Sequence, residues 1–315
     1  MLYFKYGGAL KRSFLVLTLS LFAVQSVAAQ ERRPKKVHTP SGLLDAECVH
    51  EIPNGASVDR VGNVTVDGVV VASHPPCDST HTAIHLPLPP DGGGGSGGGG
   101  GTPVENGSVE LSSALAAHLN GLQYFNFFDA YFVVPPLPTA HGQTIFYWIG
   151  LENDNHELLQ PVLEYINGGW VIQSWYVIAG VGYSSPAVVV HPGDLIYGQL
   201  KLLDYQGGFG YWGVYTSDVT TGQSTTGGFT TSSVPFPYAD GAVLEVYDVS
   251  ACNQYPSSND FYTYNYHISQ AGPAWNSWNV VTPQFYASIL PHELNCGYNV
   301  TVAPGSVRTD LYWTH

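Results

Sequence analysis

From residue 124 to the C-terminus, apolar and polar residues alternate in short runs of the kind that form β-strands. The runs at 143–151, 157–166, 170–178 and 194–204 are rich in Val, Ile, Tyr, Phe and Trp, which favour a pleated, half-buried surface. Further strands are predicted at 124–134, 187–191, 209–216, 242–249, 261–268, 275–281 and 298–302. Turn residues such as Asn167-Gly168-Gly169 separate these runs and mark the ends of strands.

This succession of strands predicts an all-β fold. Many strands at close spacing without intervening helices form either a sandwich of two antiparallel sheets or a barrel. We favour an antiparallel β-sandwich with one curved sheet, because long strands with alternating polar residues imply a solvated concave face. One short amphipathic helix is expected at 108–120.

The first 29 residues have the layout of a signal peptide. Lys5, Lys11 and Arg12 precede an apolar run at 14–24, and small residues stand where cleavage would follow Ala29. The run is short for a bilayer span, although a retained membrane anchor stays open as the alternative. We therefore expect a secreted, extracellular protein with no membrane attachment after cleavage.

Residues 30–107 are expected to form little regular structure. They contain a basic stretch broken by proline at 31–36, one candidate strand at 63–72, a proline-rich segment at 86–90 and a nearly pure glycine run at 92–101. Such a glycine run is a flexible tether. The region is interpreted as a low-complexity spacer or as a propeptide released after folding, followed by a β-sandwich domain at 108–315.

Cysteines and sequons fit an extracellular chain. Four cysteines on a secretory route are expected to form disulfides, and three pairings are possible. We favour Cys48 with Cys77 and Cys252 with Cys296, because the glycine run separates the two pairs. The cysteine and histidine spacing does not suggest zinc, and no cofactor is expected. Candidate glycosylation sites are Asn63, Asn106 and Asn299.

The charge distribution narrows the partners. The formal net charge is −14, and between residues 111 and 315 only Lys201 and Arg308 are basic against fourteen Asp and Glu residues. Such a surface repels nucleic-acid phosphates and lacks the basic residues that attract anionic membranes. The acidity is interpreted either as a means of solubility or as a sign of an acidic working pH. A monomer is expected.

Carboxylates and amides are the main candidates for chemistry. Side chains alternate between faces along a strand, so Gln160 and Glu164 share one face of their strand, and Glu245 shares a face with Val243 and Tyr247. A carboxyl between apolar residues has a raised pKa, as a general acid requires. The alternative is that these are ordinary solvent-facing strand residues.

Several of these segments together carry a resemblance to a known family. In order they are 143–154 (QTIFYWIGLEND), 158–160 (LLQ), 173–176 (QSWY), 190–196 (VHPGDLI) and 244–245 (LE). Over about residues 125–255 the chain resembles the eqolisins, the glutamic peptidases of fungi. The resemblance implies a concanavalin A-like sandwich, synthesis as a secreted precursor and cleavage of polypeptides at acid pH by a Gln–Glu pair without a cofactor.

Carried onto this sequence, the resemblance assigns Gln160 as the catalytic glutamine and Glu245 as the catalytic glutamate. Glu245 would take a proton from the attacking water and later give one to the leaving amine, while the Gln160 amide would stabilise the oxyanion. Contacts to the substrate are assigned to Glu152, Asp154, Trp175 and Tyr247.

The sequence departs from the family pattern at three positions. Pro161 follows the glutamine, Val246 stands where the family has Trp, and Glu152 stands where it has Asp. These departures are compatible with an altered glutamic-type endopeptidase or with a non-catalytic relative, so enzymatic activity stays an open question.

Two other functions are weighed against the peptidase. The series Glu152, Asp154, Glu157 matches a glycoside hydrolase pattern, but Asn and His stand between the acids and predict a polar loop. A retaining glycosidase also needs two carboxyls about 5 Å apart. The third possibility is a non-catalytic binding or structural β-sandwich, because seven Trp and twenty-one Tyr offer rings that could stack on carbohydrate or line a peptide groove, although most such rings pack in a core. The peptidase requires Gln160 and Glu245 to face each other around one water.

Overall fold

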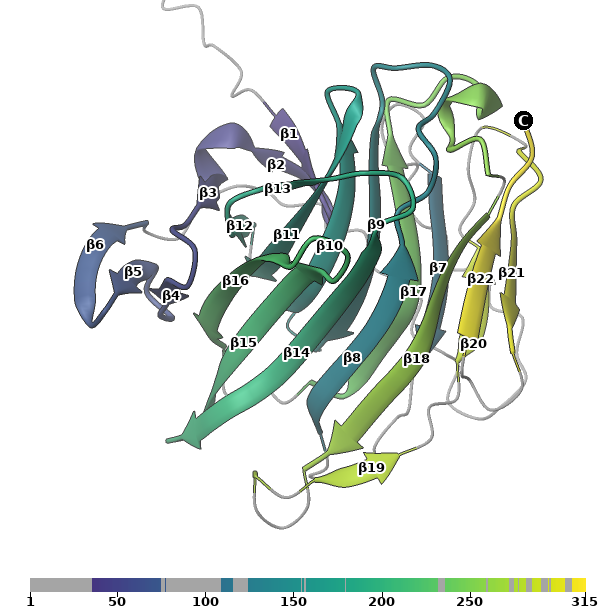
Figure 1. The fold of residues 1–315 in the computed structure, drawn as a ribbon. Helices are drawn as coiled ribbons and strands as arrows, with labels where there is room; N and C mark the ends of the chain where they lie inside the picture. The colour runs from purple at the N-terminus through teal and green to yellow at the C-terminus, as the bar shows by residue number, and fades with distance from the viewer. Residues whose placement is uncertain are drawn as a thin grey trace, which may run out of the picture. The chain divides into compact units, whose positions relative to one another are not determined.

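The computed structural model describes residues 36–315 apart from 75–76, 78–108, 116–123, 154, 156, 179, 232–235, 259, 272–274, 277, 282–284, 290–293, 295 and 304–307. These residues form two large sheets and a short hairpin (Figure 1). The predicted signal peptide and the glycine run lie outside the described residues. Across the part that is described, no helix has the length and apolar character to cross a membrane.

The first large sheet has nine strands among the described residues. Its order is β20 (Tyr286–Ile289), β7 (Val109–Leu115), β17 (Tyr238–Tyr247), β9 (Thr144–Glu152), β10 (Leu158–Ile166), β11 (Gly169–Ile178), β12 (Val181–Ser184) and β3 (Val49–Glu51), and β13 (Val188–Val190) also pairs with β11. All of its pairs are antiparallel except β12 with β3.

The second large sheet has eleven strands in the described part of the chain. Its order is β21 (Asn299–Val302), β22 (Arg308–Tyr312), β18 (Asp260–Gln270), β8 (Phe125–Val133), β14 (Leu195–Gln206), β15 (Phe209–Asp218), β16 (Gln223–Thr230), β4 (Ser57–Val58), β5 (Asn63–Val66) and β6 (Val69–Ser73), and β19 (Asn279–Val281) also pairs with β18. The separate hairpin consists of β1 (Lys36–Thr39) and β2 (Gly42–Asp45).

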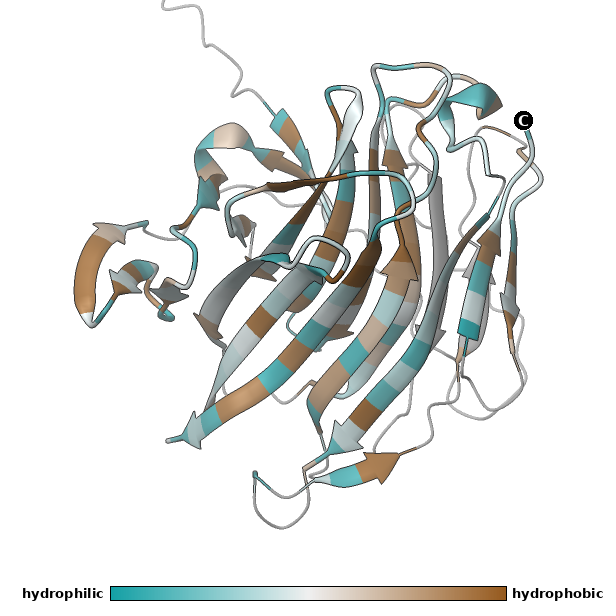
Figure 2. Cartoon of the chain, in the orientation of Figure 1, coloured by the Kyte–Doolittle hydropathy of each residue, from teal (hydrophilic) through white to brown (hydrophobic). Residues whose placement is uncertain are grey.

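The two sheets pack face to face and form the predicted β-sandwich. Every second side chain of β8 and β9 enters the shared core, for example Phe128 from one sheet and Ile149 from the other. The alternation is visible as brown and pale bands along β14 and β8 (Figure 2). At one point the sheets approach so closely that a Cβ atom on Gly198 would lie 2.7 Å from the Pro161 Cβ. Pro161 therefore belongs to the core.

The N-terminal region differs from the expectation of little regular structure. Residues 36–73 form strands β1 to β6, separated by turns and one short 3-10 helix, η1 (Ala46–Cys48). Strand β3 extends one large sheet by pairing with β12, and β4 extends the other by pairing with β16. These strands have two to five residues, too few for alternation to stand out in the sequence. Their stability comes from pairing with the edges of sheets already formed.

The helix expected at 108–120 is also corrected. Residues 109–115 form β7, which pairs with β17 on one side and β20 on the other. Hydrogen bonding to two neighbouring strands outweighs the weak helical preference of this segment, as tertiary context commonly does.

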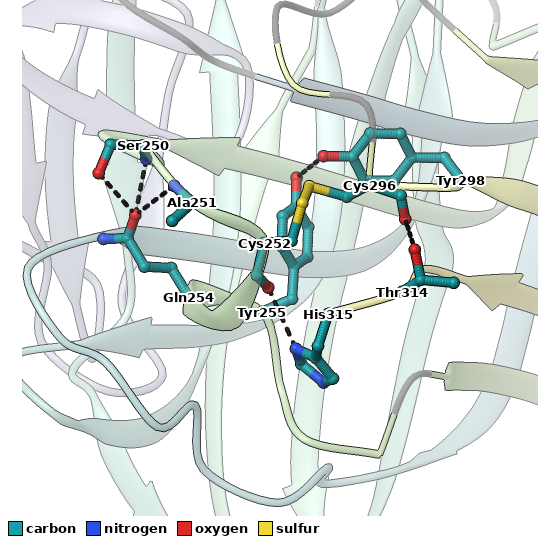
Figure 3. Close-up of a disulfide and its surroundings, with 9 residues drawn as sticks. All are labelled: Ser250, Ala251, Cys252, Gln254, Tyr255, Cys296, Tyr298, Thr314 and His315. Carbon is teal, nitrogen blue, oxygen red and sulfur yellow. Dashed lines mark hydrogen bonds between the residues drawn. A yellow bond between two sulfur atoms is a disulfide. The ribbon is translucent and has the colours of Figure 1, made fainter.

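Both predicted disulfides are confirmed: Cys48 bonds Cys77 and Cys252 bonds Cys296. The Cys252–Cys296 disulfide lies beside the C-terminal residues Thr314 and His315, as Figure 3 shows. The carbonyl oxygen of Cys296 accepts hydrogen bonds from the backbone N–H of Thr314 at 2.6 Å and from its hydroxyl at 3.0 Å, and the His315 ring lies 3.2 Å from the Cys252 carbonyl oxygen. Gln254 belongs to the 3-10 helix η2 (Cys252–Gln254). Its side-chain oxygen Oε1 accepts hydrogen bonds from the backbone N–H groups of Ser250 and Ala251, just before Cys252. The disulfide therefore joins the segment after β17 to the end of the chain.

Removal of this disulfide is expected to destabilise the sandwich. The two cysteines are 44 residues apart in the sequence, and closing a loop of that length in the unfolded chain corresponds to about 4 kcal/mol of stability. Cys252→Ala with Cys296→Ala should lower the free energy of unfolding by about 3–4 kcal/mol, measured by denaturant titration of tryptophan fluorescence. An unchanged unfolding midpoint would show that the end of the chain is held by its other contacts.

Candidate functional site

The candidate site lies on the outer face of the nine-stranded sheet, which is the face turned away from the sandwich core. An apolar cluster separate from the sandwich core covers this face. Along β10, Gln160 and Val162 point to this outer face, whereas Leu159 and Leu163 point into the core. The members of the cluster are Leu44, Phe146, Trp148, Leu158, Val162, Trp175, Val177, Val243 and Tyr247.

Strand registers place Asp240 in line with Gln160. Leu159 pairs with Leu151 and Val162 with Trp148, so the register brings Gln160 opposite Gly150. On its other side Gly150 pairs with Asp240 of β17. The Cα atoms of Gln160 and Asp240 are therefore about two strand spacings, roughly 10 Å, apart, on one face and at one level.

The residue between them has to be small. A Cβ atom on Gly150 would lie 2.8 Å from the Trp148 ring and 3.2 Å from the carbonyl oxygen of Leu159. Because Gly150 carries no side chain, the Trp148 ring lies directly over it, on the face that Gln160 and Asp240 share.

Glu245 occupies a different level of the same face. It pairs with Phe146, and Phe146 pairs on its other side with Glu164. Phe146 is four residues from Gly150 along β9, which is about 13 Å at the rise of a strand. One water molecule does not bridge that distance. Glu245 thus shares the face of Gln160, as the sequence analysis expected, but the register does not bring the two groups together.

Asp240 is in an unusual environment for a carboxyl. Its side chain is 3% exposed, and burial together with the nearby charge of Glu152 raises its pKa well above the ordinary value. Glu152 is the diagonal neighbour of Asp240, since it pairs with Tyr238 two residues away on β17. Asp240 therefore keeps its proton to a higher pH than an ordinary aspartate does.

Two buried oxygen atoms at this level have no hydrogen-bond partner among the described residues. They are Oδ2 of Asp240 and Oε1 of Gln160. Buried polar atoms are nearly always hydrogen-bonded to protein or ordered water. A water molecule or a polar group of a ligand would satisfy them, which makes this level of the face a candidate site.

The N-terminal hairpin lies over the same site. The Nε2 of Gln160 donates a hydrogen bond of 2.6 Å to the carbonyl oxygen of Pro40, in the turn between β1 and β2. Leu44 of β2 packs in the apolar cluster. His38 of β1 stacks on Tyr247 with 4.5 Å between ring centroids and hydrogen-bonds Asp248 at 2.9 Å. The hairpin therefore presents a peptide carbonyl to the Gln160 amide.

The other predicted contact residues are placed as follows. Trp175 pairs with Gln160 on the neighbouring strand β11, so it borders the site. Tyr247 lies two residues from Glu245 on the same face of β17 and donates a hydrogen bond of 3.4 Å to it. Glu152 lies beside Asp240, whereas Asp154 falls outside the described residues. Of the predicted sequons, Asn299 is exposed, Asn63 bonds Asp59, and Asn106 lies outside the described residues.

Glu157 does not belong to the site. Its carboxylate accepts hydrogen bonds from Asn153 at 2.6 Å and from the Tyr176 hydroxyl at 2.7 Å, and the Tyr176 ring is part of the sandwich core. Glu152 and Glu157 thus lie on opposite sides of the sheet, which does not favour the glycoside hydrolase pattern. Within the described residues, no three His, Cys, Asp or Glu side chains gather as metal ligands would.

Glu164 gives a testable consequence of burial on this face. It is 6% exposed, and burial raises its pKa to about 7. Between pH 4.5 and 7 the folded protein keeps this proton while the unfolded chain loses it. The free energy of unfolding therefore falls as pH rises through this interval, by about 3 kcal/mol from this group.

Glu164→Gln should remove this part of the pH dependence, because the amide does not ionise. We expect the variant to lose less stability than the wild type between pH 4 and pH 7 in thermal unfolding measured by circular dichroism. Glu51→Gln, at an exposed carboxyl of β3, is the matched control. Parallel pH profiles for the wild type and Glu164→Gln would contradict the assignment.

Comparisons with known proteins give the following. No protein-family model and no curated protein matches the sequence. Among solved structures, the chain is similar to a scytalido-glutamic peptidase with a peptide-based transition-state analogue, at 15% identity and a TM-score of 0.45, over 67% of this chain and 99% of that one. It is also similar to SCP-B, a member of the eqolisin family in complex with the tripeptide Ala-Ile-His, at 13% identity and a TM-score of 0.43, over 67% of this chain and 99% of that one.

Proposed function

We propose that this protein is a secreted peptidase that hydrolyses peptide bonds at acid pH on the outer face of the nine-stranded sheet. The observation that carries the proposal is the hydrogen bond from Gln160 to the Pro40 carbonyl, at the level of the buried carboxyl Asp240. The site thus already binds a peptide carbonyl beside a group able to move a proton. The sequence resemblance to glutamic peptidases supports the same reaction class.

The reaction follows from these two side chains. With a substrate carbonyl in the place of Pro40 and the single proton of the carboxyl pair on Glu152, a water between the carbonyl and the ionised Asp240 gives a proton to Asp240 as the water oxygen bonds the carbonyl carbon. The Gln160 amide donates a hydrogen bond to the oxyanion that forms. Asp240 then passes the proton to the nitrogen of the leaving amine, and the C–N bond breaks.

The Asp240–Glu152 carboxyl pair explains why the proposed reaction would work at acid pH. Two neighbouring carboxyls in a buried site ionise one at a time. With one proton on the Asp240–Glu152 pair, the site holds both a base and an acid. At higher pH, loss of the second proton adds a second negative charge beside the oxyanion and opposes the reaction. The aromatic residues around the site, Trp148 and Trp175, provide apolar contact for substrate side chains.

The choice between the two candidate carboxyls is tested with paired variants. Asp240→Asn and Gln160→Ala should each lower kcat on a denatured protein substrate by about 100-fold or more, the size of effect seen when an oxyanion donor is removed. Glu245→Gln should stay within several-fold of the wild type, because it lies at another level of the face.

Activity is measured from pH 2 to 7, and the thermal midpoint of each variant shows whether it folds. Loss of activity in Glu245→Gln with retention in Asp240→Asn would return the assignment to the glutamate. Equal cleavage by the wild type and all three variants would remove the peptidase proposal.

The hairpin should limit access to the site. Leu44→Asp places a charge in the apolar cluster and costs several kcal/mol of hairpin docking, so the hairpin should leave Gln160. We expect KM for a peptide substrate to fall by several-fold, as competition from Pro40 is removed. Val69→Asp, at an exposed residue of β6, is the control. An unchanged KM in Leu44→Asp would show that substrate does not compete with the hairpin.

A further inference from the structure

The outward face of the eleven-stranded sheet carries a continuous array of tyrosines. Tyr264, Tyr131 and Tyr197 are register partners on the adjacent strands β18, β8 and β14, which lie side by side in Figure 1. Their ring centroids are 6.1 Å and 4.9 Å apart, and Tyr215 of β15 follows at 6.4 Å from Tyr197. All four rings are half-buried. We call these four residues the tyrosine array.

A network of polar groups runs beside the tyrosine array. Asp129 accepts a hydrogen bond of 2.7 Å from the Tyr197 hydroxyl and lies 2.8 Å from the His267 ring nitrogen. Gln199 donates one of 2.6 Å to the same hydroxyl. By register, His267, Asp129, Gln199 and Tyr215 form the row next to the tyrosines. The network fixes the positions of these groups before any ligand binds, which reduces the entropic cost of binding.

The charges on this face are mostly compensated. His267 pairs with Asp129, and Arg308, which lies over the Tyr262 ring, pairs with Asp310. Lys201 of β14 lies over the Trp278 ring at 5.6 Å. A face of rings, hydroxyls and amides with paired charges is complementary to an uncharged ligand.

We propose that the tyrosine array and its polar row bind a neutral polysaccharide. A sugar ring has one face of C–H groups, which packs on an aromatic ring, and a rim of hydroxyls, which needs both donors and acceptors. The tyrosines supply the first contact, and Asp129, Gln199 and His267 supply the second.

The composition of the two rows favours a sugar over a protein partner. Protein interfaces have an apolar core at their centre, but no aliphatic residue stands in either row. Ser217 continues the row of Tyr264, Tyr131 and Tyr197, and Thr226 continues the row of Tyr215. The proposed site is on the sheet opposite to Gln160, so it holds whether or not the protein is a peptidase.

The test uses the full chain and a panel of neutral polysaccharides. Retardation is measured in native gels containing laminarin, hydroxyethyl cellulose, xylan or mannan, and sedimentation is measured with insoluble chitin and cellulose. We expect at least one polymer to retain the wild type and Tyr131→Ala with Tyr197→Ala to weaken that binding by about tenfold or more, as loss of stacked aromatic anchors does.

Two further variants separate ring stacking from general damage. Tyr197→Phe keeps the ring and should retain most of the binding. Tyr205→Ala removes a half-exposed tyrosine that contacts Tyr124 outside the array and should bind like the wild type. Thermal midpoints confirm that each variant folds.

Three results would overturn the proposal. They are the absence of retention on every polymer, equal retention of the double variant and the wild type, and retention on immobilised proteins alone. The last of these would make the array a protein-binding surface.

Discussion

The backbone hydrogen-bond ladder that joins β10, β9 and β17 decides which side chains of this protein can act together. A residue of an antiparallel strand is opposite one partner on each neighbour, so the register through β9 fixes the level of every side chain on the outer face. Gln160 and Asp240 share the level of Gly150, and Glu164 and Glu245 share the level of Phe146. The two levels are about 13 Å apart, and no rotamer change moves a carboxyl from one to the other.

One irregularity in that ladder explains why alternation in the sequence did not place Asp240 on the face of Gln160. The register between β17 and β9 shifts between Asp240 and Val243, because β17 has one extra residue there, as in a β-bulge. Strict alternation from Glu245 would place Asp240 on the core face, whereas the bulge returns it to the outer face. The predicted strand also began at 242, after Asp240. An acidic residue beside Gly241 was the available signal, but a bulge cannot be located from alternation alone.

Sequence analysis predicted the features that are encoded by long alternating segments and missed those that depend on short strands or single contacts. The sandwich and most strands from 124 onward follow from repeated alternation, whereas β12, β16, β20 and β22 were not predicted. The disulfide pairs follow from the position of the glycine run. Strands β3 and β4 each have no more than three residues. They form because they pair with the sheet-edge strands β12 and β16, so their own sequences do not reveal them. The contact between Pro40 and Gln160 joins residues 120 apart in the sequence, so no local pattern contains it.

Burial of acidic groups links the stability of this face to its proposed chemistry. Glu164 and Asp240 both have raised pKa values because they are buried, and the nearby charge of Glu152 adds to the shift at Asp240. Their neutral forms cost little to bury, whereas their charged forms are costly, so the covered face is most stable at the acid pH where the reaction needs a retained proton. At higher pH, the ionised carboxylates are costly to bury, which opposes the covering of this face. In the proposed reaction, the reluctance of a buried carboxyl to ionise would therefore favour both the burial of this face and the retention of the proton that the reaction needs.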